Sequence, residues 1–149
     1  MGRIWDDQLT ERDKQVYSKA GYSRRSGFGS RPAILAIDVS YDFVGDKPEP
    51  ILDSIEKFPC SCGEEGWAGV YRIRELLSFA RGKGVPILYT TAGERENTIR
   101  VGGWARKTSH SLDLTEMSRK MGSQIVAEIA PQTDDIVIRK DKPSAFFLH

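Results

Sequence analysis

Three short apolar segments most constrain what this chain can fold into. They are residues 33–38 (AILAID), 85–91 (VPILYTT) and 136–139 (IVIR). Nearly continuous apolar runs of this length are typical of strands that are buried on both faces of a parallel sheet. The distances between them suit the right-handed crossover connections that parallel strands require. The pattern predicts an α/β fold built on a doubly wound, Rossmann-like parallel sheet.

The connecting segments carry helical patterns of unequal strength. Residues 67–80 place their apolar side chains on one broad face, with glutamates before them and a Gly-Lys-Gly-Val-Pro stretch after them, which predicts a helix. A weaker stripe covers residues 114–125 and is interrupted by Gly122. Residues 43–66 are rich in proline and glycine, and we expect a long loop there with one short helix at residues 51–57.

The first 30 residues differ from the rest of the chain. They are mostly charged, with Leu9, Val16 and Tyr17 spaced as a thin helical stripe, and they end in the segment GYSRRSGFGSR. This glycine-rich segment precedes a strand instead of joining a strand to a helix, so a flexible connector is favoured over a phosphate-binding loop. We predict an N-terminal arm and linker at residues 1–30, followed by a domain at residues 31–149.

Composition excludes several classes of function. Lys and Arg total 22 against 21 Asp and Glu, and a net charge of +1 argues against a nucleic-acid partner. There is no apolar run near the roughly 18 residues that span a bilayer, and the polar, acidic start is unlike a signal peptide. We therefore expect a cytoplasmic protein with no membrane partner.

The sequence has few residues that could bind a metal ion or form a disulfide. Cys60 and Cys62 are one residue apart, which is poor spacing for a disulfide and too few ligands for a structural zinc site. The two histidines, His110 and His149, are far apart in the sequence. The expectation is no catalytic metal and no cofactor.

Two charged residues follow apolar segments. Ligands bind at the carboxyl ends of strands in open α/β sheets, so Asp38 is placed to act as a base. An aspartate that caps a helix or binds a loop is an equally good interpretation. Lys140 follows the third segment in the same way and would reach the same edge, although a solvated lysine is the alternative.

Five sequence blocks together resemble a known family. The resemblance, over residues 31–147, is to the isochorismatase-like cysteine hydrolase superfamily, and most of all to its amidohydrolase branch, which includes N-carbamoylsarcosine amidase and maleamate amidase. Its most specific part combines an Ile-Asp pair and a following Asp-Phe with a distant block that ends in Phe-Phe. The blocks are RPAILAIDVSYDF, SCGEEGW, GVPILYTT, GGWARK and EIAPQTDDIVIRKDKPSAFF.

The resemblance implies a six-stranded parallel sheet and a Cys-Asp-Lys catalytic triad. Asp38 matches the family aspartate and Lys140 the family lysine. In that chemistry a cysteine thiolate attacks an amide or carbamoyl carbon while the aspartate carries the proton, and the lysine favours the thiolate. Phe43 and Trp104 match positions near the substrate pocket, although core packing is the alternative for both. Cys62 matches a position that we interpret as a packing residue.

The resemblance also places the nucleophile outside these 149 residues. In the family the cysteine follows the fourth strand, beyond the last block of this chain. The family strand order, 3-2-1-4-5-6, would put the strand at residues 33–38 beside strand four and leave its apolar edge open. We therefore expect the C-terminal half of the same protein, as a separate chain, to complete the sheet and supply the cysteine.

The favoured function is an amidohydrolase that acts on a small amide or carbamoyl substrate and is complete only with that C-terminal part. The family members are commonly oligomeric, which implies a homo-oligomer of undetermined size. Two alternatives stay open: an isochorismatase-type vinyl ether hydrolase, which does not need the cysteine, and a non-catalytic or truncated scaffold with the same fold. The sequence does not identify the substrate.

Overall fold

The computed structural model describes residues 4–22, 24–27, 29–93, 115–140 and 144–146. The chain divides into two compact units, Met1–Ser30 and Arg31–His149, which we describe separately. Within the described residues, no helix combines the length and the apolar character needed to cross a membrane.

The first unit contains a 3-10 helix, η1 (Asp6–Gln8), and an α-helix, α1 (Glu11–Ala20). The helix α1 begins with a capping box, in which the Thr10 hydroxyl accepts from the backbone N–H of Asp13 and the Asp13 carboxylate accepts from the backbone N–H of Thr10. It ends at Gly21, whose φ of 79° is the left-handed conformation that glycine adopts at low cost. No residue of α1 is buried, which fits the thin apolar stripe in its sequence.

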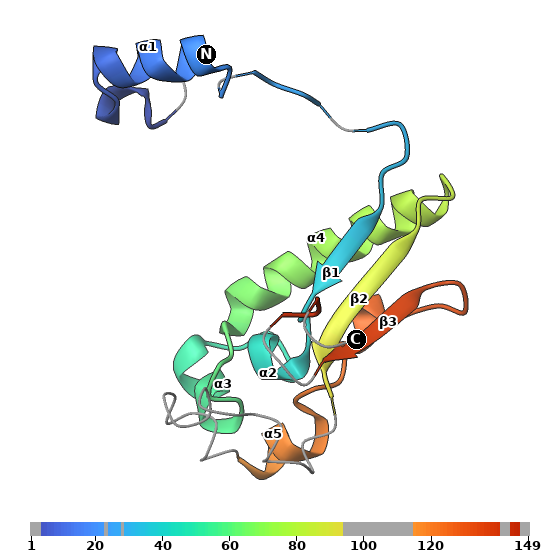
Figure 1. Cartoon of the computed structure of the whole chain (residues 1–149). Helices are drawn as coiled ribbons and strands as arrows, with labels where there is room; N and C mark the ends of the chain where they lie inside the picture. The colour runs from blue at the N-terminus through green and yellow to red at the C-terminus, as the bar shows by residue number, and fades with distance from the viewer. Residues whose placement is uncertain (1–3, 23, 28, 94–114, 141–143, 147–149) are drawn as a thin grey trace. The chain divides into compact units, whose positions relative to one another are not determined.

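The second unit is built on a parallel sheet of three described strands (Figure 1). They are β1 (Ile34–Ile37), β2 (Ile87–Ala92) and β3 (Ile136–Lys140), in the order β1-β2-β3. Each of the three apolar segments forms one of these strands, so the predicted α/β class with a parallel sheet is confirmed. The register places Thr90, in the central strand, beside both Ile37 and Ile138.

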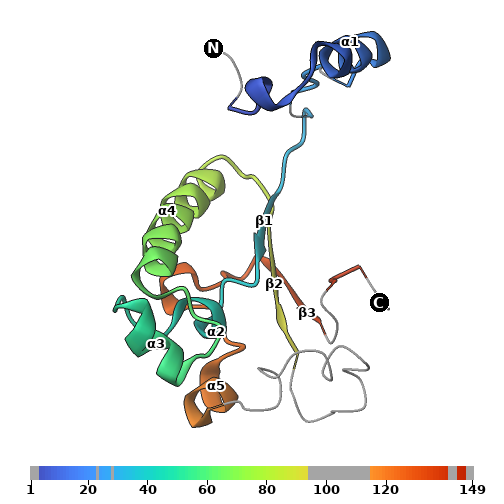
Figure 2. The same cartoon turned by 90° about the vertical axis from the view of Figure 1, so that its left-hand side faces the viewer.

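The helices of this unit lie together on one side of the sheet (Figure 2). As predicted, a short helix occupies residues 51–57, while the long helix begins at Gly63, four residues earlier than the pattern indicated. A four-residue helix at the start of the predicted loop was not expected. The elements are α2 (Tyr41–Val44), α3 (Ile51–Lys57), α4 (Gly63–Arg81), α5 (Glu116–Met121) and the 3-10 helix η4 (Ala127–Ile129).

Gly63 explains why α4 begins where it does. Its φ is 60°, and a Cβ atom at this position would lie 2.8 Å from the Cα atom of Ile51. Only glycine fits this close approach to the α3 backbone without displacing it. The backbone N–H of Gly63 is satisfied by the Ser61 hydroxyl at 3.0 Å, which fixes the entry into the helix.

The core lies between α4 and one face of the sheet. Trp67, Val70 and Leu77 are buried on the inner side of α4, but Leu76, which the helical pattern placed on the same face, is half-exposed. Strand residues on this side alternate with residues on the other side, as a pleated strand requires. The buried cluster consists of Ala36, Val44, Trp67, Val70, Leu77, Ala80, Ile87, Tyr89, Val126 and Ile129.

The opposite face of the sheet is open within the part of the chain that the structure describes. Leu35 is 43% exposed, Ile37 60% and Ile136 54%. The expectation that the first strand is buried on both faces is therefore wrong for the described residues. The reason is that the described helices α2 to α5 all lie on the other side (Figure 2).

Candidate active site

Asp38 and Lys140 are in contact at the carboxyl ends of the strands. The Lys140 Nζ atom lies 2.7 Å from Asp38 Oδ2, and the two side chains are 10% and 25% exposed. Asp38 directly follows β1 and Lys140 is the last residue of β3, so the ion pair reaches across the central strand β2. A charge-assisted hydrogen bond of this length, largely withdrawn from water, is among the stronger polar contacts in proteins.

Thr90 of β2 provides the second partner of the carboxylate. Its hydroxyl donates to Asp38 Oδ1 at 2.8 Å, so each carboxylate oxygen accepts a hydrogen bond from a described residue. The backbone N–H of Asp38 donates in return to the Thr90 carbonyl at 3.0 Å, and its contact with the Thr90 hydroxyl oxygen is 3.2 Å. Thr90 was not among the residues predicted for the site from the sequence. The available signal was its position near the carboxyl end of the middle apolar segment.

The backbone at Asp38 is unusual. Its φ is 54°, and among the residues that the structure describes it is the one non-glycine residue with a positive φ. The left-handed region is costly for L-residues, although aspartate and asparagine tolerate it better than most. Such conformations concentrate at functional sites, where the surrounding contacts hold them in place.

The register assigns the site to the open face of the sheet. Ala36 and Tyr89 are neighbours in the register and point into the core beside α4. Thr90 and Lys140 occupy the alternate positions of their strands, so their side chains lie on the other face. The carboxylate, its two partners and the exposed apolar residues of β1 thus share one side of the sheet.

The other predicted residues are placed as follows. Phe43 lies on α2, just after the turn that follows β1, and its side chain is half-exposed. Trp104 lies outside the described residues. Cys60 and Cys62 are both exposed, and Cys62 occupies the N-cap position of α4. The exposure of Cys62 among the described residues does not support its interpretation as a packing residue.

Within the described part of the chain, no three His, Cys, Asp or Glu side chains gather in a way that could hold a metal ion. The arrangement at Asp38 offers a different chemistry. A carboxylate oxygen that accepts one hydrogen bond from a described residue retains a lone pair that can accept a proton. The adjacent ammonium group can stabilise negative charge on a reacting group.

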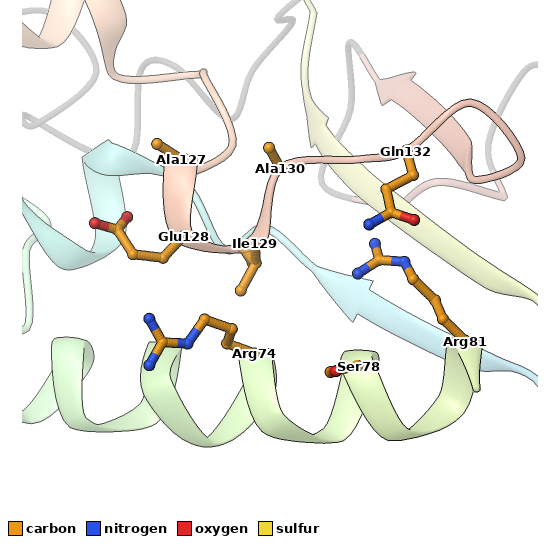
Figure 3. Close-up of a pocket in the computed structure, with 8 residues that line it drawn as sticks. All are labelled: Arg74, Ser78, Arg81, Ala127, Glu128, Ile129, Ala130 and Gln132. Atoms are coloured by element: carbon orange, nitrogen blue, oxygen red, sulfur yellow. The ribbon is translucent and has the colours of Figure 1, made fainter. Parts of the chain in front are cut away.

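A surface pocket of about 490 Å³ lies elsewhere, between α4 and the η4 segment (Figure 3). Arg81 at one end of this pocket is already engaged, because it donates to Asp135 at 2.6 Å and to the Tyr89 hydroxyl at 3.0 Å. Neither Asp38, Thr90 nor Lys140 lines the pocket, so it is separate from the candidate site. Its lining residues are Arg74, Ser78, Arg81, Ala127, Glu128, Ile129, Ala130 and Gln132.

Comparison with known proteins gives a consistent result. The Isochorismatase domain matches residues 32–148. N-carbamoylsarcosine amidase from Arthrobacter sp. is 32% identical over 145 residues, which cover 94% of this chain and 50% of that protein. Maleamate amidohydrolase from Pseudomonas putida is 27% identical over 130 residues, 85% of this chain and 54% of that protein.

Among solved structures, an isochorismatase family protein from Desulfovibrio vulgaris is similar, with a TM-score of 0.53 and 25% identity. The match covers 77% of this chain and 55% of that protein. The present chain spans about half the length of the curated relatives that it matches.

Proposed function

This chain belongs to the isochorismatase family, and on that premise we propose that it forms part of a cysteine hydrolase that cleaves a C–N bond in a small amide or carbamoyl compound. The observation that carries the proposal is the Asp38 carboxylate, held between Lys140 and Thr90 at the carboxyl ends of three parallel strands. Both curated relatives are named as enzymes that cleave amides.

The proposed reaction assigns one role to each charged group. Asp38 accepts the proton of a cysteine thiol, and the resulting thiolate attacks the carbonyl carbon of the substrate. Asp38 returns that proton to the departing amine or ammonia as the C–N bond breaks, which leaves a thioester from an amide or a thiocarbamate from a carbamoyl compound. Water then hydrolyses this intermediate, which releases the carboxylic or carbamic acid and regenerates the thiol. Lys140 stabilises the thiolate through its positive charge.

We further propose that the cysteine comes from the remainder of the protein, which covers the open face of the sheet. Two observations support this. The chain spans about half the length of its relatives. The candidate site and the exposed side chains of Leu35 and Ile37 also lie on the same face of the sheet. A segment that packs on these apolar side chains would therefore lie next to Asp38. The separate C-terminal chain, the homo-oligomer and the cytoplasmic location stay predictions, as do substrate contacts by Phe43 and Trp104.

The test is hydrolysis by the full-length protein, assayed first with N-carbamoylsarcosine and maleamate. Asp38→Asn keeps the shape and removes the base, and Lys140→Met removes the charge. We expect each variant to lose about 10³-fold or more in kcat/KM. Alkylation of thiols abolishes activity in the wild type. Asp53→Asn, an exposed change on α3, is the matched control and retains full activity.

The outcomes separate the alternatives. Activity that survives both substitutions and alkylation overturns the triad. Activity that needs Asp38 but resists alkylation indicates the vinyl ether chemistry of isochorismatases, to be checked with a vinyl ether substrate. A folded full-length protein that hydrolyses no amide, carbamoyl or vinyl ether compound indicates a scaffold.

A further inference from the structure

We propose that Thr90 is a positioning residue, whose hydroxyl holds the Asp38 carboxylate in the orientation in which it exchanges a proton with the nucleophile. This inference rests on the function proposed above, because it assigns the reason why Asp38 can act as a base. Thr90 lies in the central strand of the sheet, between the strands that carry Asp38 and Lys140, and contacts Asp38 directly.

The role of Thr90 follows from the direction of its hydrogen bonds with Asp38. A threonine hydroxyl has one proton to donate, and here it is given to Asp38 Oδ1 at 2.8 Å. The backbone N–H of Asp38 approaches the Thr90 hydroxyl oxygen at 3.2 Å, where it meets a lone pair of that oxygen. Thr90 therefore contacts both the backbone and the side chain of Asp38.

Lys140 alone does not fix the carboxylate. Its ammonium group sits on a flexible four-carbon stem and contacts Oδ2 at 2.7 Å. One contact to one oxygen leaves the Asp38 side chain free to change its torsion angles, the one about the Cα–Cβ bond included. A second contact, to Oδ1, removes that freedom.

Thr90 is well suited to supply the second contact. Its side chain is 2% exposed. It is β-branched, so its first side-chain torsion angle is restricted, and it lies in a strand that is paired on both sides. The hydroxyl is therefore fixed by the sheet itself. Asp38, by contrast, lies at a strand end with a left-handed backbone, where its orientation depends on such contacts.

The next residue offers a matched control. Thr91 is as buried as Thr90, but it points to the other face of the sheet, where its hydroxyl donates to the backbone carbonyl of Ser123. The same substitution at the two positions removes one buried hydroxyl in each case. Only the change at residue 90 removes a partner of Asp38.

The experiment compares Thr90→Val, Thr90→Ser and Thr91→Val in the full-length protein. Valine keeps the shape and loses the hydroxyl, whereas serine keeps the hydroxyl and loses the methyl group. We expect Thr90→Val to lower kcat by about 10- to 100-fold with KM changed by less than about 3-fold, because misplacement of a catalytic group acts on the chemical step. Thr90→Ser and Thr91→Val keep kcat within about 3-fold, even where their melting temperatures fall.

A second measurement does not depend on turnover. Three-bond couplings of Asp38 in isotope-labelled protein report its side-chain rotamer. We expect one rotamer in the wild type and in Thr90→Ser, and averaged couplings in Thr90→Val. If no amide substrate is hydrolysed, the proposed function fails, and these couplings still decide whether Thr90 orients Asp38.

Two results overturn the inference while leaving the proposed function intact. One is a Thr90→Val variant with wild-type kcat and a single Asp38 rotamer, in a protein that Asp38→Asn inactivates. The other is a Thr90→Ser variant as impaired as Thr90→Val, since the methyl group rather than the hydroxyl would then be the part that matters.

Discussion

Among the described residues, charged side chains are paired at two places beside this sheet. At the carboxyl ends Asp38 meets Lys140, and just before β3 Asp135 accepts from Arg81 at 2.6 Å. Arg81 also donates to the Tyr89 hydroxyl, so the last residue of α4 is bonded both to the central strand β2 and to the residue that precedes β3. The first pair lies on the open face and is proposed to act on a substrate. The second joins the helix to the sheet and is structural.

The second pair predicts a pH dependence of stability. Burial of the Asp135 carboxyl raises its pKa, but hydrogen bonds from the Gln132 backbone and from Arg81 outweigh this, and the pKa lies below its ordinary value. A lowered pKa in the folded state means that the unfolded chain binds the proton more readily. The stability from Asp135 is therefore fully present above about pH 5 and is lost as the pH falls below about 4.

Asp135→Asn tests this dependence. At pH 7 we expect the free energy of unfolding of the variant to be about 1–3 kcal/mol lower than that of the wild type, because a neutral amide replaces a buried, hydrogen-bonded carboxylate and is a weaker partner for Arg81. Between pH 5 and pH 3 it should lose less stability than the wild type. Urea unfolding of the full-length protein across that range provides the measurement, with the exposed Asp134→Asn as control. Parallel curves for Asp135→Asn and the wild type would contradict the assignment.

At the residue scale, the sequence predicted the charged part of the candidate site and missed the neutral part. A carboxylate and a lysine that follow apolar segments are conspicuous, and the resemblance named the same two residues. Their 2.7 Å contact depends on strand order and register, which the sequence does not specify. Thr90 was not predicted as a site residue, because a β-branched threonine inside an apolar run is explained by its preference for strands.

At the element scale, Gly122 illustrates how a glycine allows two helices to approach each other closely. The helix α5 ends at this residue, whose carbonyl accepts from the backbone N–H of Asp42 at 2.9 Å. A Cβ atom here would lie 2.0 Å from Asp42 Oδ1. The buried Asp42 carboxylate also accepts from the Ser118 hydroxyl, so α2 and α5 approach too closely for any side chain at residue 122.

Gly122→Ala should therefore destabilise the protein by about 1–3 kcal/mol, because the added methyl group forces backbone or carboxylate to move. Gly82→Ala is the matched control. Gly82 has the same right-handed helical conformation at the end of α4, and a Cβ atom there would meet nothing closer than 3.5 Å. That change should be neutral or stabilising, since alanine favours the helix. Thermal unfolding of the two variants measures this difference. Equal melting temperatures of Gly122→Ala and Gly82→Ala would rule out the proposed clash at residue 122.

The elements divide into those that local pattern determines and those that tertiary contacts determine. Helix α4 shows a strong periodic pattern and was predicted to within a few residues at its start. Helix α2 has four residues, too few for any period to be visible, and it is held by a bond from the Tyr41 N–H to the carbonyl of Gln124. Its sequence alone is compatible with the loop that we predicted.

At the scale of the whole molecule, the sequence and the described structure differ over one face of the sheet. The apolar run of β1 predicted burial on both sides, yet Leu35 and Ile37 are exposed in the described residues. An apolar sheet face is not left in water without cost, since each large aliphatic side chain gains about 1.5–3 kcal/mol on burial. The sequence pattern therefore supports a second covering layer, which we propose the remainder of the protein provides.

Ile37→Ser in the full-length protein tests this proposal. If the remainder packs on the open face, Ile37 becomes a core residue there and its truncation should cost about 2–4 kcal/mol. Leu52→Ser, at an exposed position on α3, should change the free energy of unfolding by no more than about 0.5 kcal/mol. Urea unfolding of the two variants makes the comparison. Equal small effects would mean that solvent reaches Ile37 in the whole protein, and the source of the nucleophile would then have to be sought on another side of Asp38.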